Sequence, residues 1–372
     1  MMKLHTALGR LTPMLLSMAL AASCAAPIVV PEGPNAVPLI KADGSANLGV
    51  WTGQIDVTDP RNYEHGFFYD MFQGVREKAW QYIGIYTDEV IIGMAIVDTG
   101  YLGTVFCYIY DRKSGKLWET EVQPPFGSGI QIDRNVAMGR SHYDDGEDFV
   151  LMDNDVEKGR RQIQLSLEED DVRFDLAVEI FDDFKKIQPL QANRPTSGDT
   201  FSFTHKVTGL AVDGAAQLGD TIYSFDPTKD FGVIDYTFGF PAYHTVWNWA
   251  SFSGYADDGT LVGLNLVDPI QDDVINENGM WIDGKLHQLG KANYAFDPED
   301  TLKPWKVTTA DGSVDLTFTP LGKRQQSINM LVLSSVFQQP FGTFSGTLET
   351  KDGRVYTITN LPGVVEDHEA KW

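Results

Sequence analysis

Four short segments of this 372-residue chain recur in the same order in its two halves. Each match is weak by itself, but unrelated hairpins have no reason to keep a common order. The sequence therefore predicts two related structural units in tandem. The pairs are VIIGMAIVD (90–98) with TLVGLNLVD (260–268), SGKLW (114–118) with DGKLH (283–287), DVRFDLAV (171–178) with SVDLTFTP (313–320), and GVID (232–235) with GVVE (363–366).

The local pattern of the chain is that of an all-β protein. From Trp51 onward, short β-rich runs alternate with Gly, Asp, Asn and Pro, and no long segment keeps a helical period. We therefore expect a tandem pair of related antiparallel β-domains, at 48–240 and 241–372. Sheets of this size must protect their edges, and closing each sheet into a barrel is one efficient way. A pair of β-sandwiches is the alternative.

The N-terminus resembles an export signal. Lys3 and Arg10 precede an apolar stretch at 11–22, which is too short to span a bilayer but suits a signal peptide over residues 1–24. The stretch ends in LAASC, which resembles a bacterial lipobox and predicts lipidation of Cys24, with ordinary cleavage as the alternative. Prolines and small residues at 25–47 indicate a tether. We expect a protein exported to the bacterial periplasm or cell envelope.

Charge and cysteine content exclude several partners. With 29 basic and 52 acidic side chains, the formal charge of −23 disfavours nucleic acid and anionic membrane surfaces, so membrane contact is expected only through the N-terminal anchor. Cys24 and Cys107 are the only cysteines, and Cys107 lies on a strand face with apolar residues, which predicts a buried thiol. The sequence has no metal-binding spacing and no cofactor motif, so we expect no metal and no cofactor.

Aromatic residues concentrate in PAYHTVWNWASFSGY (241–255). On a strand, Tyr243, Trp247 and Trp249 would point to one side and His244 to the other. Core packing is the favoured interpretation of Trp247, Trp249 and Trp281, and stacking on a ligand is the alternative.

Two polar residues precede Trp281 close to a predicted turn. Glu277 and Asn278 therefore lie near a strand end, where polar side chains can face the mouth of a cavity. The Asp-Gly pair at 283–284 is explained by ordinary turn chemistry.

Asp235 and Glu366 occupy matching places in the last repeated segment. Asp235 is followed by His244 and the tryptophans after it, and Glu366 by His368 and Trp372. A carboxyl group beside aromatic walls has its charged form disfavoured, which suits acid catalysis. The repetition itself favours a structural role, such as binding backbone amides. If one acid has a chemical role, we expect it to be Asp235, because the aromatic cluster follows it closely.

Three segments and the aromatic run carry a resemblance to a known family. They are EKAWQYIGIYTDEVIIGMAIVDTGYLGTVFCYIYD (77–111), ENGMWIDG (277–284) and LPGVVEDHEAKW (361–372), and they resemble bacterial domain of unknown function 2804 over about residues 48–372. More remotely, the layout is similar to the double-lipocalin group that includes carotenoid hydratases and cyclases. That resemblance implies lipocalin-like barrels and an apolar, often isoprenoid, ligand, and some members of the group protonate an alkene.

Three functions follow as hypotheses. The first is an exported binding or carrier protein for an apolar small molecule such as a lipid or isoprenoid. The second is a hydratase, cyclase or isomerase that acts on such a ligand by acid catalysis. The third is a carbohydrate-active protein with two carboxyl groups. An apolar pocket with one buried carboxyl favours the enzyme, the same pocket without it favours the carrier, and an open groove with two facing carboxylates favours the third.

Overall fold

The computed structural model describes residues 37–53, 55–56, 63, 73–196, 200–269, 275–330 and 333–372. Within these ranges the elements are β-strands apart from the short helix α2 (Gln73–Arg76) and the 3-10 turn η2 (Val156–Lys158). The all-β prediction is confirmed. The signal peptide, Cys24 and the tether up to residue 36 lie outside the described residues. None of the helices in these ranges has the length and hydropathy that a membrane span requires.

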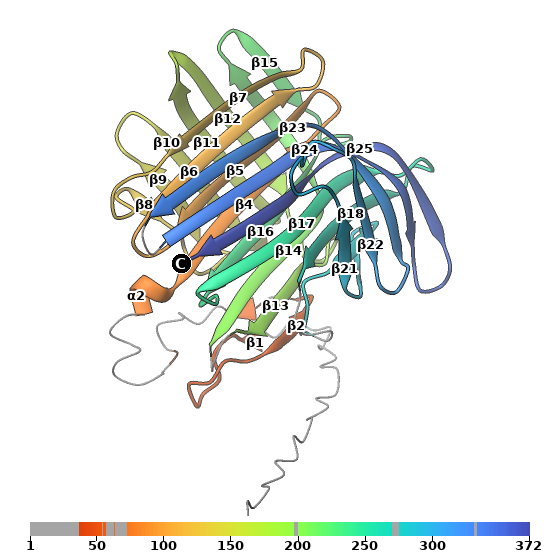
Figure 1. The fold of residues 1–372 in the computed structure, drawn as a ribbon, viewed down its shortest axis with the longest axis horizontal. Coiled ribbons are helices and arrows are strands. Elements are labelled where there is room, and N and C mark those ends of the chain that lie inside the picture. The colour runs from red at the N-terminus through yellow and green to blue at the C-terminus, as the bar shows by residue number, and fades with distance from the viewer. Residues whose placement is uncertain are drawn as a thin grey trace, which may run out of the picture.

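The first large sheet is built from the N-terminal two thirds of the chain and is antiparallel throughout (Figure 1). Its strands in spatial order are β7 (Lys116–Val122), β6 (Gly103–Asp111), β5 (Val90–Asp98), β4 (Lys78–Tyr86), β16 (Phe231–Gly239), β14 (Phe201–Leu218), β12 (Val172–Phe181), β11 (Arg160–Glu169), β10 (Phe149–Asp155), β9 (Arg140–Asp144) and β8 (Ile130–Gln131). The long strand β14 also pairs with β13 (Leu190–Pro195) and β15 (Thr221–Phe225), and β13 pairs with β2 (Gly49–Trp51).

The second sheet is formed by the C-terminal part of the chain and is also antiparallel. The chain passes from one sheet to the other between Gly239 and His244. The strands of the second sheet in spatial order are β20 (Lys285–Gln288), β19 (Gly279–Ile282), β18 (Leu261–Asp268), β17 (His244–Tyr255), β25 (Val355–Lys371), β24 (Leu333–Glu349), β23 (Val314–Met330), β22 (Trp305–Thr309) and β21 (Ala292–Ala295).

The two sheets share one strand order. In the first, β4 begins a meander through β5, β6 and β7, and its other neighbour is β16, the last strand of that sheet. In the second, β17 begins a meander through β18, β19 and β20, and its other neighbour is β25. All four repeated segments therefore fall on corresponding elements, for example 90–98 on β5 and 260–268 on β18. The predicted tandem pair of related β-domains is confirmed.

Each sheet curls around its own apolar core. One core takes Ile83 of β4, Leu165 of β11 and Phe174 of β12, which all belong to the first sheet. The other takes Leu264 of β18 and residues of β22 to β24 from the second sheet. A sheet that supplies the walls of its own core is barrel-like, whereas a sandwich core lies between two separate sheets. The structure therefore favours the barrel prediction over paired sandwiches. Cys107 is buried in the first core, as predicted.

A third apolar cluster joins the two sheets through their outer faces. The side chains that alternate with the inner core on β4, β5 and β6 point outward and pack against β17, β24 and β25, which cross over these strands in Figure 1. Aromatic side chains dominate this contact, as in the stacking of Tyr108 on Phe341 with ring centroids 5.5 Å apart. The members are Tyr82, Tyr86, Ile91, Ala95, Phe106, Tyr108, Tyr110, Val233, Trp249, Val267, Phe341 and Val364.

The glycine that recurs in the first repeated segment has a packing role in both domains. A Cβ on Gly93 would lie 2.5 Å from the ring of Tyr108, and one on Gly263 would lie 1.9 Å from Oγ1 of Thr208. Real Cβ atoms do not come this close to neighbouring atoms, so both positions need a residue without a side chain. Glycine in a strand commonly marks such a close approach.

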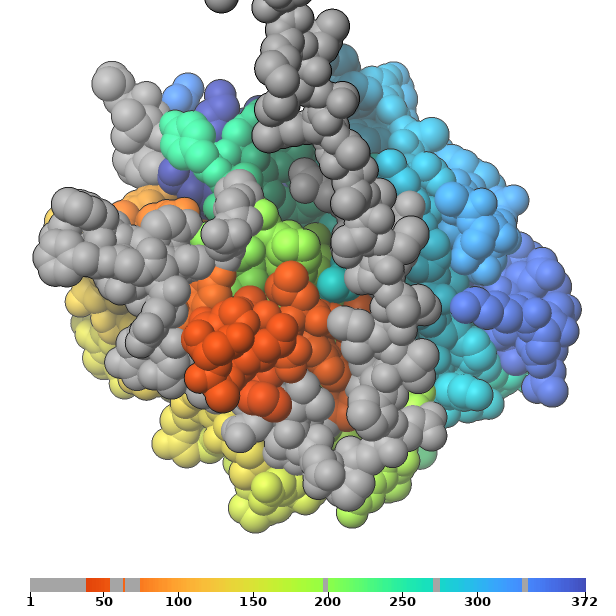
Figure 2. Space-filling model, turned by 90° about the horizontal axis from the view of Figure 1, so that it is seen from below, coloured from red at the N-terminus to blue at the C-terminus, as the bar shows by residue number. Residues whose placement is uncertain are grey.

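Residues 37–47, the last part of the predicted tether, pack against the first domain. Val37–Pro38 (β1) pairs in parallel with Ile55–Asp56 (β3), and Leu39 and Ile40 are buried in the first core. Figure 2 shows this N-terminal segment in orange-red against strands of the first sheet. Burial of each apolar side chain contributes about 1.5–3 kcal/mol, which offsets the cost of ordering the backbone here.

A buried ion pair lies inside the first domain. Arg161 of β11 donates from Nε to Asp182 at 2.7 Å and from Nη1 to Asn154 at 2.7 Å, and its Nη2 lies 3.4 Å from His205. The side chains of Arg161 and Asp182 are fully buried. Charges removed from water in this way are stable only while each keeps its partner.

We expect Asp182→Asn to lower the free energy of unfolding by about 3–5 kcal/mol, because Arg161 then remains as a buried charge without its counter-ion. Urea denaturation measures the change. The matched control is Asp153→Asn, since Asp153 and Arg140 form an exposed pair at 2.5 Å with side-chain exposures of 31% and 62%. Loss of that pair should cost less than about 1 kcal/mol. Equal losses in the two variants would contradict this account.

Candidate functional site

A cavity of about 940 Å³ lies between the outer faces of the two sheets. The strands that supply described lining residues are β4, β5, β6, β13, β14 and β16 of the first sheet and β17, β18, β23, β24 and β25 of the second. Ligand pockets usually measure roughly 300–1,000 Å³, so the cavity has the size of a ligand site. The cavity lies beside the apolar cluster that joins the two sheets, at a place where the side chains of the two sheets do not pack against each other.

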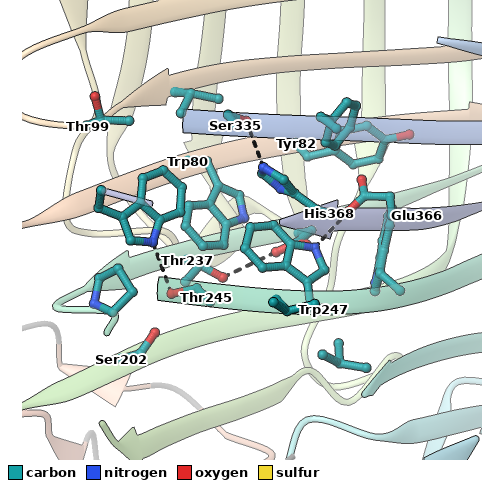
Figure 3. A pocket seen from close by; sticks show the side chains of 18 of the residues that line it. Trp80, Tyr82, Thr99, Ser202, Thr237, Thr245, Trp247, Ser335, Glu366 and His368 are labelled. Carbon is teal, nitrogen blue, oxygen red and sulfur yellow. Dashed lines mark hydrogen bonds between the residues drawn. The ribbon is translucent and has the colours of Figure 1, made fainter. Parts of the chain in front are cut away.

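Aromatic rings from the first strand of each domain form one wall. Trp80 of β4 and Trp247 of β17 are stacked with ring centroids 6.0 Å apart and planes at 11°. Tyr82 meets Trp249 edge to face at 5.4 Å, and Trp249, which is 3% exposed, donates from Nε1 to Asn265 at 2.8 Å. Trp249 is therefore part of the packed core as well as of the wall. Figure 3 shows Trp80, Tyr82 and Trp247 around the cavity.

Glu366 of β25 faces the cavity from the aromatic wall. It is buried, and its two carboxyl oxygens accept hydrogen bonds from Nε1 of Trp247 at 3.0 Å and from Nε2 of Gln339 at 2.6 Å. Burial raises the pKa of Glu366 to about 7, because these two neutral donors only partly replace the lost hydration of the charged form. The carboxyl group therefore holds a proton for much of the time near neutral pH.

His368 lies next to Glu366 on the same face of β25. Its ring packs edge to face against Trp247 with centroids 4.1 Å apart, and its Nε2 lies 2.9 Å from the hydroxyl of Ser335. Burial lowers the pKa of His368 to about 3, so the imidazole is neutral at physiological pH. Its Nδ1 atom is buried and has no hydrogen-bond partner among the described residues.

Another part of the lining holds a cluster of compensated charges. Lys206 of β14 forms ion pairs with Asp235 and, at 3.3 Å, with Glu277, whose other oxygen lies 2.7 Å from Arg194. Burial raises the pKa of Asp235, and the Lys206 ammonium counteracts part of that rise. Burial also opposes ionisation of Glu277, but Arg194 and Lys206 outweigh it and hold the pKa of this carboxyl below its usual value. Two cations thus face two carboxylates.

Arg324 of β23 is a third cation in the lining, and its side chain is buried. Its guanidinium lies over the ring of Phe106 at 3.9 Å from the centroid and forms an ion pair with Glu121 of β7. Glu121 also accepts a hydrogen bond from Gln326. Arg324 therefore joins the two sheets by a cation–π contact and an ion pair.

The cavity brings together most of the residues that the sequence singled out. Asp235, Glu366, Trp247, Trp249, Glu277 and His368 line it, and His244 lies at its exposed rim, where its Nε2 is 2.8 Å from Glu369. The two repeated acids thus share one cavity, although they come from different domains.

Three of the predicted ligand contacts are not part of the lining. Tyr243 is 59% exposed on the surface. Asn278 accepts from the amide of Val267 at 2.7 Å and donates to the carbonyl of Gly290 at 3.0 Å, so it fixes loop backbone. Trp281 is buried and donates from Nε1 to the carbonyl of Gln188 at 2.6 Å.

Sequence reasoning identified Asp235 but missed the rest of the first domain's contribution to the lining, above all Trp80, Tyr82, Arg194 and Lys206. One signal was present: Lys206 follows FSFTH on a strand rich in apolar and small residues. A lysine in such a strand needs a buried partner. In the part of the chain that the structure describes, no three His, Cys, Asp or Glu side chains lie close enough to hold a metal ion.

Fold and site together define a two-domain β-protein with a ligand-sized cavity between corresponding curled sheets. The chain belongs to the family described as domain of unknown function (DUF2804), whose model matches residues 32–372. This confirms the resemblance drawn from the sequence motifs. A comparison with curated proteins finds no match.

Two solved structures share part of the layout. One is a protein described as AttH from Nitrosomonas europaea, with a TM-score of 0.44 and 14% identity over 84% of this chain and 96% of that one. The other is kievitone hydratase from Nectria haematococca, with a TM-score of 0.44 and 10% identity over 79% of this chain and 88% of that one. Likeness at this level carries no information about what this chain binds.

We expect Glu366→Gln to remove part of the pH dependence of stability. Between the usual glutamate pKa of 4.5 and the folded value of about 7, the folded chain keeps a proton that the unfolded chain has lost. Raising the pH through this window should therefore cost the wild type on the order of 3 kcal/mol from this group alone, and the amide variant should be spared that loss. Urea denaturation at pH 4.5 and 8 measures it. Parallel pH profiles for the two proteins would contradict the assignment.

Proposed function

We propose that this protein binds a small, largely apolar molecule in the cavity between its two sheets. The observation that carries the proposal is the stacked aromatic wall, Trp80 on Trp247 beside Tyr82 and Trp249, around a space of about 940 Å³. Interfaces between domains normally pack as densely as protein interiors. An opening of this size within an otherwise packed aromatic contact is best explained as room for a ligand.

Apolar walls set the chemical character of that ligand. Ala95, Val97 and Val267 line the cavity together with the aromatic rings, and burial of apolar ligand surface against them contributes roughly 25 cal/mol per Å². The export expected from residues 1–24 extends the proposal: the protein would hold its ligand in the bacterial cell envelope, attached through Cys24.

Filling the cavity should abolish binding without unfolding the protein. Ala95 is buried on β5 and lines the cavity, so Ala95→Phe should weaken binding of the uncharged fluorescent probe N-phenyl-1-naphthylamine by at least about tenfold, or 1.4 kcal/mol. Ala295 is exposed on β21 outside the cavity, and Ala295→Phe is the matched control. Fluorescence titration measures both dissociation constants. Unchanged binding by Ala95→Phe with a preserved melting curve would place the ligand elsewhere.

Acid catalysis on the bound ligand is a second candidate, favoured by Glu366. Its carboxyl carries a transferable proton near neutral pH, as general acids require. The adjacent tryptophan faces would stabilise a carbocation formed by protonating an alkene. Among the repeated acids the geometry favours Glu366 over Asp235, because the Lys206 ammonium stabilises the ionised form of Asp235.

Deuterium uptake separates the enzyme from the carrier. An isomerase that adds and removes a proton in D₂O should introduce deuterium into farnesol, which mass spectrometry detects as a mass increase on carbon. Glu366→Gln should bind farnesol but introduce none. Binding by the wild type without any deuterium uptake would leave only the carrier function.

Glycoside cleavage has less support. It needs two carboxyl groups that act on the scissile bond from opposite sides. Asp235 and Glu277 are both held by Lys206, and Glu366 is surrounded by apolar and aromatic walls.

A further inference from the structure

We infer that the cavity selects a ligand whose polar end is an uncharged hydroxyl or carbonyl group and rejects the carboxylate of the same molecule. The inference rests on the proposed binding function and names the class of ligand. It is not implied by apolar walls alone, because a cavity with lysine and arginine in its lining is also what a fatty-acid site would have.

Three cations of the described lining, the buried Lys206 and Arg324 and the partly exposed Arg194, are already paired with carboxylates. Arg194 pairs with Glu277, Lys206 with both Asp235 and Glu277, and Arg324 with Glu121. A carboxylate that entered would have to displace one of these partners and leave it buried without a counter-ion. Breaking a buried pair in this way costs more free energy than the new pair would restore.

The remaining cation of the lining lies at the rim. Lys371 is exposed, and its ammonium is therefore hydrated and screened. An ion pair in such a position contributes too little binding free energy to offset the desolvation of a ligand carboxylate in the cavity.

Neutral hydrogen-bonding groups are available deeper in the lining. Nδ1 of His368 is buried and has no partner among the described residues, although Nε2 of the same ring contacts Ser335. Both oxygens of Glu366 already accept hydrogen bonds, from Trp247 and Gln339. In its neutral form the carboxyl group also carries a proton, which it can donate to an acceptor in the cavity. A hydroxyl group can accept this proton and also bond to His368, and a carbonyl group can accept it.

The position of these groups sets where the polar end binds. Trp247 contacts both Glu366 and His368, so the three side chains form one continuous surface, as Figure 3 shows. A ligand hydroxyl bound there would lie against the tryptophan, and the apolar part would extend along the aromatic wall. Ionised Glu366 would repel a ligand carboxylate at the same place.

A matched pair of isoprenoid probes tests the selectivity. All-trans-retinol and retinoic acid differ at the polar end, and both absorb tryptophan emission, so quenching reports their binding near Trp80 and Trp247. At pH 8 both retinoic acid and most of Glu366 are ionised, so the retinol hydroxyl can donate to the Glu366 carboxylate while retinoate is repelled by it, and we expect retinol to bind at least about tenfold more tightly. The retinol preference should shrink in Asp235→Asn, because Lys206 then loses one of its two carboxylates. Asp153→Asn removes an acid outside the cavity and should leave the preference unchanged.

The outcomes separate this inference from the proposed function. If retinoate binds as tightly as retinol or more tightly, the selectivity is overturned while the binding function stands. If neither retinoid nor N-phenyl-1-naphthylamine binds to protein with an intact melting transition, the binding function fails as well. An equal change of preference in Asp235→Asn and Asp153→Asn would overturn the inference that the Lys206–Asp235 pair sets the selectivity.

Discussion

Packing of the two sheets through their outer faces is the contact on which the rest of this structure depends. Each sheet curls around one apolar core and would otherwise expose a second apolar face on β4 to β6 or on β17, β24 and β25. Exposure of such an apolar face to water costs free energy, and packing the faces of the two sheets against each other buries both of them. The cavity, its aromatic wall and the meeting of two acids from separate domains all result from this arrangement.

Much of the fold could be predicted because both faces of the central strands are buried. VIIGMAIVD and GTVFCYIYD are nearly continuous apolar runs, as strands buried on both faces must be. The glycine that 90–98 shares with 260–268 leaves room for Tyr108 in the first domain and for Thr208 of the other sheet in the second. The same pattern could not show what covers each face. It therefore gave no sign that the cavity lies between the two domains. Likewise, a proline-rich composition at 25–47 concealed Leu39 and Ile40, whose burial depends on contacts with distant strands.

The sequence identified cavity-lining residues that recur in both domains. It could not predict roles that depend on side chains from neighbouring strands. Repetition identified Asp235 and Glu366, and both line the cavity. Which of them is ionised depends on side chains from adjacent strands, Lys206 for one and Gln339 for the other, and no local pattern connects these residues. Trp281 and Asn278 were predicted to contact a ligand, but their polar atoms instead form hydrogen bonds with backbone groups of neighbouring loops and strands.

Asp235 is paired with the charged Lys206 and Glu366 with the neutral Gln339, so the charge density differs between the two sides of the cavity. On the side of the first domain, the acid of the repeat lies in a dense group of full charges, whereas on the side of the second domain its counterpart is bonded to an amide and an indole. An elongated molecule with a single polar end would therefore have one preferred direction in this space. Divergence of the two related domains has in this way given the cavity one charged end and one uncharged end.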